Sequence, residues 1–211
     1  IKFKRGLFEN PDCEIEKLEE AMRNEEKEEV SKKIAQDSLI LLKNDGVLPI
    51  KKGTKIAVIG PHADSLRYPV SGYTYPAYIE MMDAGRKNSA AVTFNGIADE
   101  QAKAEKEKAP KGPFETLFDM LDEEDVKQLD DMNGVLRTLH TRSLKEVLSD
   151  RFETVYAQGC DIIGTSEDGF SDVVKAANES DVVVMALGGN CGWVNVTGGE
   201  GKDRQSLELP G

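Results

Sequence analysis

The sequence predicts an α/β fold, a three-layer α/β/α sandwich with a mostly parallel sheet, plus a helical insertion. Three short apolar runs bounded by turn residues have the composition of buried parallel strands, at 55–60, 153–158 and 181–187. Helical patterns at 142–150 and 168–180 each precede one of the later runs. Because this alternation places helices on both faces of a parallel sheet, three layers are expected.

The residues before the first strand have helical patterns and no strand. Residues 1–11 contain a glycine and an Asn-Pro pair, so they are expected to form a loop or an extended tail. A charged helix is expected at about 14–24. A second is expected from about 26 to 43, because its apolar residues recur at spacings of three, four and seven. Gly46 is then well placed to cap its C-terminal end.

The middle of the chain departs from the alternation of strands and helices. No strand is expected from about 77 to 140. Residues 101–112 are rich in Ala, Lys, Glu and Pro and are typical of a mobile, solvated linker. Helices are expected at 114–121 and 123–136. We interpret this region as a helical insertion between two strands of the sheet.

Composition and charge narrow the classes of partner. The 211 residues are 39% hydrophobic and 31% charged, which is ordinary for a globular protein. The formal net charge of −12 disfavours binding to nucleic acid and to anionic membranes, whereas a neutral sugar is indifferent to it. No apolar run approaches the ~20 residues that span a bilayer.

The cysteines and histidines do not predict a metal site. Cys13, Cys160 and Cys191 are far apart, and neither they nor His62 and His140 have the spacing of zinc ligands. Neither a metal nor a cofactor is expected. Free thiols favour a reducing compartment, so a cytoplasmic location is preferred over a secreted one.

A glycine-rich loop follows the third strand, at the edge of the sheet where α/β proteins bind ligands. Gly188, Gly189 and Gly192 do not have the Gly-x-Gly-x-x-Gly spacing, and no helix follows at once, so nucleotide binding is disfavoured. His62 lies at the end of the first strand, where a catalytic role would require a nucleophile nearby. The aromatic-rich loop at 71–76 is interpreted either as a cleft wall or as ordinary turn packing.

Glu200 is the candidate catalytic residue. It lies between two glycines, which allow a loop to present its carboxylate to a neighbouring surface, and the alternative is a solvated loop glutamate. Asp203 and Arg204 follow closely and are candidates for a supporting ion pair or cap. Trp193 precedes the glutamate by seven residues; tryptophan stacks on sugar rings, although an isolated one more often packs internally.

Several segments, in chain order, resemble glycoside hydrolase family 3, in particular its β-glucosidase and β-xylosidase members. The pattern Gly-Glu-Gly-x-Asp-Arg followed by Leu-Pro-Gly is similar to the family's acid/base loop, and KIAVIGPHAD to the first strand of its second domain. The segments that carry the resemblance are 4–11, 37–50, 55–64, 156–161, 199–204 and 206–211.

The resemblance implies a retaining exo-β-glycosidase that removes terminal β-linked glucose or xylose from a glycoside or oligosaccharide. It assigns the general acid/base to Glu200 and the nucleophile to an aspartate of an N-terminal (β/α)₈ barrel that this chain lacks. It also favours substrate contacts from Trp193, Lys202, Asp203 and Arg204. Lys202 stands where many relatives carry an aromatic residue, which leaves the leaving-group subsite open.

The resemblance also divides the chain. Residues 1–52 correspond to the tail of the barrel domain and interdomain linker helices. Residues 53–211 correspond to a C-terminally truncated α/β sandwich domain with the helical insertion at about 77–140. The chain alone is therefore expected to be inactive. The alternatives are a non-catalytic α/β ligand-binding or interaction module and, disfavoured by the loops, a flavodoxin-like nucleotide binder.

Overall fold

The computed structural model describes most of the chain outside 88–126. The described residues are 1–12, 14–22, 25–70, 72–87, 127, 130–194, 196–199, 203–204 and 206–209. The chain divides into two compact units, Ile1–Ile50 and Lys51–Gly211, which are described separately.

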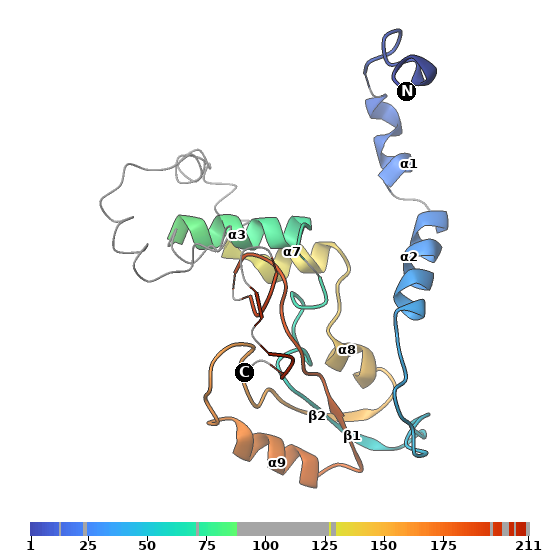
Figure 1. The fold of residues 1–211 in the computed structure, drawn as a ribbon. Helices are drawn as coiled ribbons and strands as arrows, with labels where there is room; N and C mark the ends of the chain where they lie inside the picture. Colours follow the sequence, from blue (N-terminus) through green and yellow to red (C-terminus); the bar gives the residue numbers. More distant parts are fainter. Residues whose placement is uncertain are drawn as a thin grey trace, which may run out of the picture. The chain divides into compact units, whose positions relative to one another are not determined.

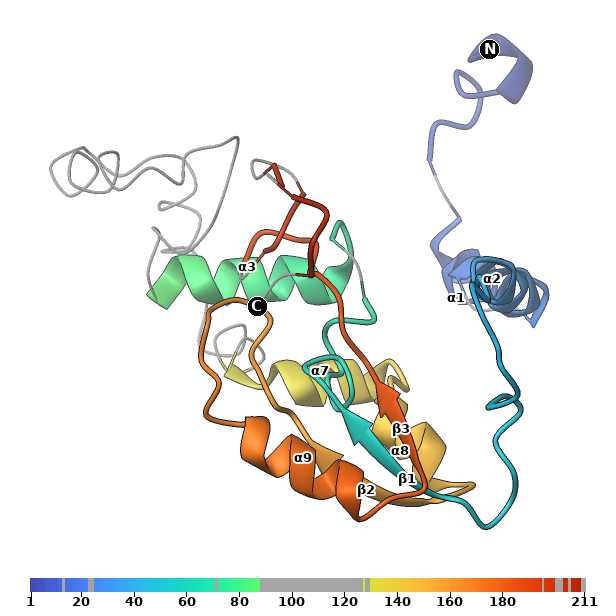
Figure 2. The same cartoon turned by 60° about the horizontal axis from the view of Figure 1, so that its bottom comes forward.

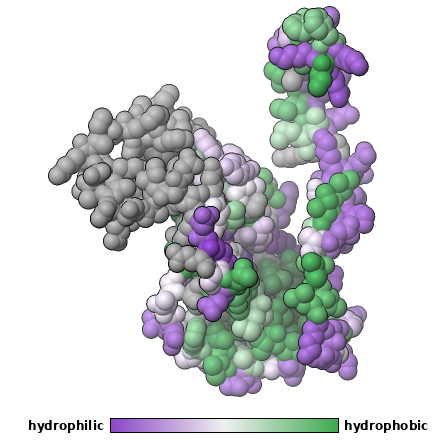
Figure 3. All heavy atoms as spheres, viewed as in Figure 1, coloured by the Kyte–Doolittle hydropathy of each residue, from purple (hydrophilic) through white to green (hydrophobic). Residues whose placement is uncertain are grey.

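The first unit consists of short helices and extended segments (Figure 1). Its elements are the 3₁₀ helices η1 (Phe3–Arg5) and η2 (Ile15–Lys17) and the α-helices α1 (Leu18–Met22) and α2 (Glu25–Asp37). None of these elements buries a side chain, and Figure 3 shows hydrophobic residues on the surface of this unit. The apolar stripe of α2 is therefore not buried by any described residue of its own unit.

The expected helix from 26 to 43 is wrong at its C-terminal end, because α2 ends at Asp37. The Ser38 hydroxyl donates to the Ala35 carbonyl over 2.7 Å, a local bond that competes with continued helix. The next four residues, 39–42, are all apolar and all exposed. Helices in proteins are stabilised mainly by packing against other elements, and these exposed residues have none within the described part of their unit. Helix propensity alone is therefore not enough to extend α2 past Asp37.

The second unit contains a three-stranded parallel sheet, which confirms the predicted α/β class. The strands are β1 (Lys55–Ile59), β2 (Glu153–Ala157) and β3 (Val182–Met185), in the order β2-β1-β3 (Figure 2). The central strand is the most deeply buried, with Ile56 and Val58 inaccessible to solvent. Each strand lies within one of the three predicted apolar runs.

Helices cover both faces of this sheet, as predicted. Since the connections from β1 to β2 and from β2 to β3 cross the sheet in opposite directions, right-handed crossovers require opposite faces. The helix α9 (Phe170–Asn178) packs on one face, and α8 (Leu144–Ser149) contacts the other, where the Ser149 and Thr154 hydroxyls are 2.7 Å apart. Four buried residues form the cluster under α9: Ala57, Ile59, Ala157 and Ala176.

Among the described residues of the insertion between β1 and β2, two further helices are present. These are α3 (Tyr75–Lys87) and α7 (Met132–Thr138), with Met132 packed against the buried side of α3. Most of α3 lies in the region interpreted as a helical insertion, but no helix was expected at these particular residues, although Pro76 is favourable in a first helical turn. The expected helix at 114–121 and the linker at 101–112 lie outside the described residues, and α7 contains only the last part of the helix expected at 123–136.

The loops after β1 and β3 meet at the carboxyl edge of the sheet. The amide of Ala186 donates to Ile59 over 2.8 Å, and the amide of His62 donates to Ala186 over 3.2 Å. Gly60 lies between these bonds with a φ of 105°, and a β-carbon there would collide with the Ala186 carbonyl. Glycine is therefore required for both its backbone conformation and its closeness to β3.

Gly60→Ala should destabilise the chain by at least ~2 kcal/mol more than Gly53→Ala, measured by urea unfolding. Gly53 is the matched control, since its φ is also positive (81°) but nothing lies within 4 Å of a β-carbon there. That control should cost only the ~1–2 kcal/mol of a left-handed non-glycine residue. Equal losses in the two variants would contradict the close approach of Gly60 to β3.

An ion pair joins α7 to α8. Nη2 and Nη1 of Arg137 donate to the Glu146 carboxylate, at 2.7 and 2.9 Å, and the Ser143 amide donates to it over 2.8 Å. These hydrogen bonds, that of Arg137 above all, lower the pKa of Glu146 from 4.5 to about 2. Ser143 caps the same helix in a reciprocal capping box, and its hydroxyl donates to Asp64 over 2.7 Å.

A lowered pKa makes stability depend on pH in a defined window. The unfolded chain binds the Glu146 proton near pH 4.5 and the folded chain only near pH 2, so this contribution is present above pH 4.5 and is lost as the pH falls towards 2. Glu146→Gln should therefore flatten the decline of unfolding free energy between about pH 5 and pH 2 in urea titrations. Arg137→Met should flatten it likewise, and unchanged slopes in both variants would exclude the pair as the cause.

Candidate functional site

The loop after β3 is closed at its base by Asn190 and Thr197. The Asn190 amide donates to the Thr197 hydroxyl over 2.9 Å, and the Thr197 amide donates back to the Asn190 carbonyl over 3.0 Å. The hydroxyl of Thr197 also donates to that carbonyl, over 3.3 Å. Asn190 is 4% exposed, and its side-chain amide donates to the Val194 carbonyl over 3.2 Å. Residues seven positions apart are thus joined by three hydrogen bonds, which fixes both ends of the loop.

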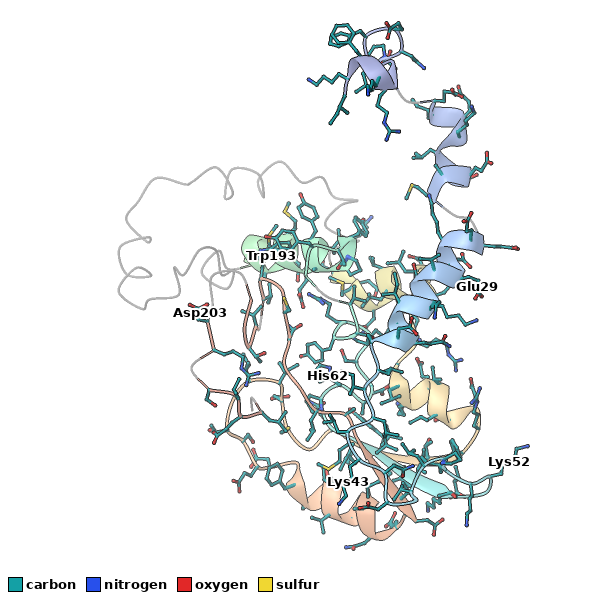
Figure 4. The ribbon with its side chains drawn as sticks, turned by 45° about the vertical axis from the view of Figure 1, so that its right-hand side comes forward. Glu29, Lys43, Lys52, His62, Trp193 and Asp203 are labelled. Atoms are coloured by element: carbon teal, nitrogen blue, oxygen red, sulfur yellow. The ribbon has the colours of Figure 1, made fainter. Side chains whose placement is uncertain are left out.

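Trp193, at the centre of this loop, packs against the insertion helix α3 (Figure 4). It is 8% exposed, and its ring lies edge-on to Tyr73 with the two centroids 5.0 Å apart. The buried residues of α3 that share its cluster are Ala77, Ile79, Met81 and Met82. The indole thus anchors the loop to α3, and the sugar contact predicted for Trp193 remains a prediction.

The loop after β3 also contacts an ion pair between Arg67, in the loop that follows β1, and Glu80, on α3. Arg67 is 7% exposed; its Nε donates to Glu80 over 3.0 Å, and its Nη1 donates to the Val70 carbonyl. A β-carbon on Gly192 would approach Nη2 of Arg67 to 3.0 Å. The backbone at Gly192 is therefore packed closely against the guanidinium, and a larger residue there would displace one or the other.

A polar hollow of about 260 Å³ opens beside this ion pair, at the carboxyl ends of β1 and β2. Burial raises the pKa of Glu80 against the opposing effect of Arg67, and burial, reinforced by Glu80 and Asp161, raises the pKa of Tyr68. Arg67 contacts Oε2 of Glu80 through its Nε and its Nη2, each at 3.0 Å. The lining residues are Pro61, Asp64, Ser65, Arg67, Tyr68, Glu80, Tyr156 and Gln158.

His62 lies at the same edge of the sheet (Figure 4). Its Nε2 is buried and has no hydrogen-bond partner among the described residues. The nitrogen is 3.6 Å from the position of a β-carbon on Gly188, and the ring lies 5.0 Å from that of Tyr68. Because Nε2 has no hydroxyl or thiol as a hydrogen-bond partner in the described part of the chain, the structure adds nothing to a catalytic role for His62.

The structure describes only some of the predicted site residues. Glu200 and Lys202 lie outside the described residues, so the acid/base assignment stays a prediction from the sequence. Asp203 and Arg204 are described and exposed. Arg204 donates to the Glu208 carbonyl, and its Nη1 is 3.8 Å from a β-carbon placed on Gly189. Arg204 therefore lies near the start of the same loop.

Two further observations concern metals and membranes. Within the described residues, no cluster of three or more histidine, cysteine or carboxylate side chains has the arrangement needed to hold a metal ion. In the same part of the chain, no helix combines the length and the apolar composition needed to cross a membrane. Cys160 and Cys191 are both free thiols.

Sequence reasoning missed the residues that hold the loop in place. Asn190, Arg67 and Glu80 carry no motif. Thr197 belongs only to an Asn-x-Thr glycosylation sequon at 195–197, which does not predict its hydrogen bonds. The partners of all four residues are identified only by the tertiary structure. A sequence signal existed for the loop itself, since it follows the third predicted strand. The pairing of an asparagine with a threonine seven residues later has no local pattern that would have distinguished it.

Comparison with known proteins identifies the family to which this domain is similar. The glycosyl hydrolase family 3 C-terminal domain matches residues 39–211. A beta-xylosidase of Formosa agariphila is 27% identical over 215 residues, covering 100% of this chain and 22% of that protein. Probable exo-1,4-beta-xylosidases of Aspergillus flavus and Aspergillus oryzae are each 24% identical over 184 residues, covering 87% of this chain. The matches span 16% and 15% of those two proteins.

The chain thus spans about a fifth of the curated relatives that it matches. The region that matches the family, 39–211, includes all three strands, both helices that cover the sheet and the loop from Asn190 to Thr197. With the parallel sheet and its two layers of helices, these findings establish that the chain belongs to glycosyl hydrolase family 3, as a C-terminal α/β domain.

Proposed function

We propose that this chain supplies the acid/base half of a retaining exo-β-glycosidase that acts on terminal β-linked xylose or glucose. The observation that carries the proposal is the family match over 39–211, which includes the Gly-Glu-Gly segment at 199–201. The named relatives are β-xylosidases, which favours xylose as the sugar removed. The nucleophile would be an aspartate of a barrel domain outside this chain.

The chemistry explains why two domains would share one site. A retaining glycosidase needs two carboxyl groups ~5–5.5 Å apart on opposite sides of the scissile bond. Glu200 would first protonate the leaving oxygen and then deprotonate the attacking water. Placing the nucleophile on one domain and the acid on another puts the sugar at a domain interface, where pockets commonly form. A closed, sugar-filled cleft would raise the pKa of Glu200 for the first step.

The surrounding residues have supporting roles in this proposal. Asp203 and Arg204 are exposed in the described structure, so both are accessible to a sugar or to a second domain. Lys202 would contribute a cation where an aromatic residue is common in the family. Trp193, anchored in the α3 cluster, would act mainly by holding the loop, with only its exposed edge available to substrate.

The purified 211-residue chain should not hydrolyse nitrophenyl β-xyloside or nitrophenyl β-glucoside, because half of the carboxyl pair is absent. Folding of the same sample, checked by circular dichroism and cooperative urea unfolding, provides the control. Clear turnover by a folded, pure chain would contradict the assignment of the nucleophile to another domain.

In a polypeptide that joins this chain to a barrel domain of its family, Glu200→Ala should lower kcat/KM for xylobiose by ~10²–10⁴-fold, the usual contribution of a general acid. A dinitrophenyl β-xyloside needs little protonation, so its kcat/KM should fall less than ~10-fold. Added azide should restore the second step by replacing water as the nucleophile. Glu179→Ala, which removes an exposed acid at the C-terminal end of α9, is the matched control and should match the wild type. Equal loss on both substrates would argue against the acid/base role.

A further inference from the structure

The Thr197 hydroxyl occupies an unusually constrained place in the loop after β3. It accepts a hydrogen bond from the Asn190 amide over 2.9 Å and donates one to the Asn190 carbonyl over 3.3 Å. A β-carbon on Gly189 would collide with the same oxygen. The hydroxyl is therefore packed directly on the backbone of residues 189 and 190. Valine has nearly the same shape but would leave the amide of Asn190, a buried residue, without its acceptor.

The segment enclosed by this pair contacts the glycine that precedes the candidate acid. A β-carbon on Gly199 would lie 3.3 Å from the Cys191 sulfur and 3.8 Å from the Gly192 amide nitrogen. Gly192 in turn lies on Arg67, and Trp193 is buried against α3. Residues 191 and 192 are thus held between the buried guanidinium and Gly199. Any shift of the loop would be transmitted to Gly199, which is joined by a peptide bond to Glu200.

We propose that Thr197 is a positioning residue for the acid/base, and that its hydroxyl closes a clamp on Asn190 that fixes the backbone leading into Glu200. This proposal rests on the proposed function, since it gives Thr197 no chemical step of its own. By fixing the backbone as far as Gly199, the clamp would limit the positions from which the Glu200 carboxyl could reach a glycosidic oxygen. Loss of the clamp should therefore harm the reaction in proportion to its need for proton donation.

A purely structural threonine would behave differently. If Thr197 only stabilised the fold, its substitution would lower the active fraction and reduce turnover of every substrate by the same factor. A positioning residue instead changes the ratio between a substrate that needs protonation and one that does not. The leaving-group dependence of kcat/KM is therefore the deciding readout.

The experiment compares Thr197→Val with Thr197→Ser in the polypeptide that joins this chain to a barrel domain. We expect Thr197→Val to lower kcat/KM for xylobiose by ~10–100-fold, as for other residues that orient a reacting group, and for a dinitrophenyl β-xyloside by less than ~3-fold. Thr197→Ser keeps the hydroxyl and should recover most of the loss. The matched control is Thr138→Val, which removes a hydroxyl that donates to the Val135 carbonyl on α7 and should leave both rates unchanged.

Hydrogen exchange on the 211-residue chain tests the clamp without catalysis. The Asn190 amide should exchange faster in Thr197→Val than in the wild type or in Thr197→Ser, because only valine removes its acceptor. Unchanged exchange in Thr197→Val overturns the clamp. Leaving-group dependence in Glu200→Ala without any in Thr197→Val overturns the positioning role alone. An absence of leaving-group dependence in both overturns the proposed function itself.

Discussion

The pairing of β1 with β3 at the carboxyl edge of the sheet is the constraint on which the site depends. Gly60 is packed on the Ala186 carbonyl, and backbone hydrogen bonds from Ala186 and His62 join the two strand ends. Parallel strands present their carboxyl ends at one edge, so the loops that leave β1 and β3 start side by side. The loop after β1, which carries Arg67, therefore meets the loop after β3. Arg67 can then anchor the loop after β3 through its contact with Gly192.

The sheet and its covering helices were predictable because their signals are local. Each strand is a short apolar run between turn residues, and Ser143 with Glu146 forms the capping box that starts α8. Two features were not predictable in this way. The end of α2 at Asp37 depends on a serine side-chain bond and on missing packing. The buried residues of α3 occur at 77, 79, 81 and 82, and this mixture of spacings of two, three and four gave no clear helical signal in the sequence.

The candidate site likewise has residues that the sequence could predict and residues that it could not. Glu200 was a candidate from its place between two glycines, and only the family resemblance predicts an acid/base role for it, because a glutamate in such a loop has many possible roles on spacing alone. The clamp of Asn190 with Thr197 and the pair of Arg67 with Glu80 were invisible in the sequence, since their partners are specified by tertiary contacts. Trp193 illustrates the limit of residue type as a guide, because a sugar-stacking side chain is here mostly buried against α3. The structure thus shows how the loop after β3 is held in place, and the family resemblance is the source of the chemistry proposed for Glu200.

The most direct measurement of the central claim is the pH dependence of kcat/KM for xylobiose in the barrel-containing polypeptide, with Glu200 intact and as Glu200→Gln. A general acid must be protonated in the free enzyme, so its ionisation produces the alkaline limb of a bell-shaped profile. The account predicts that this limb disappears in Glu200→Gln while the acidic limb, set by the nucleophile, remains. An alkaline limb that persists unchanged in Glu200→Gln would contradict it.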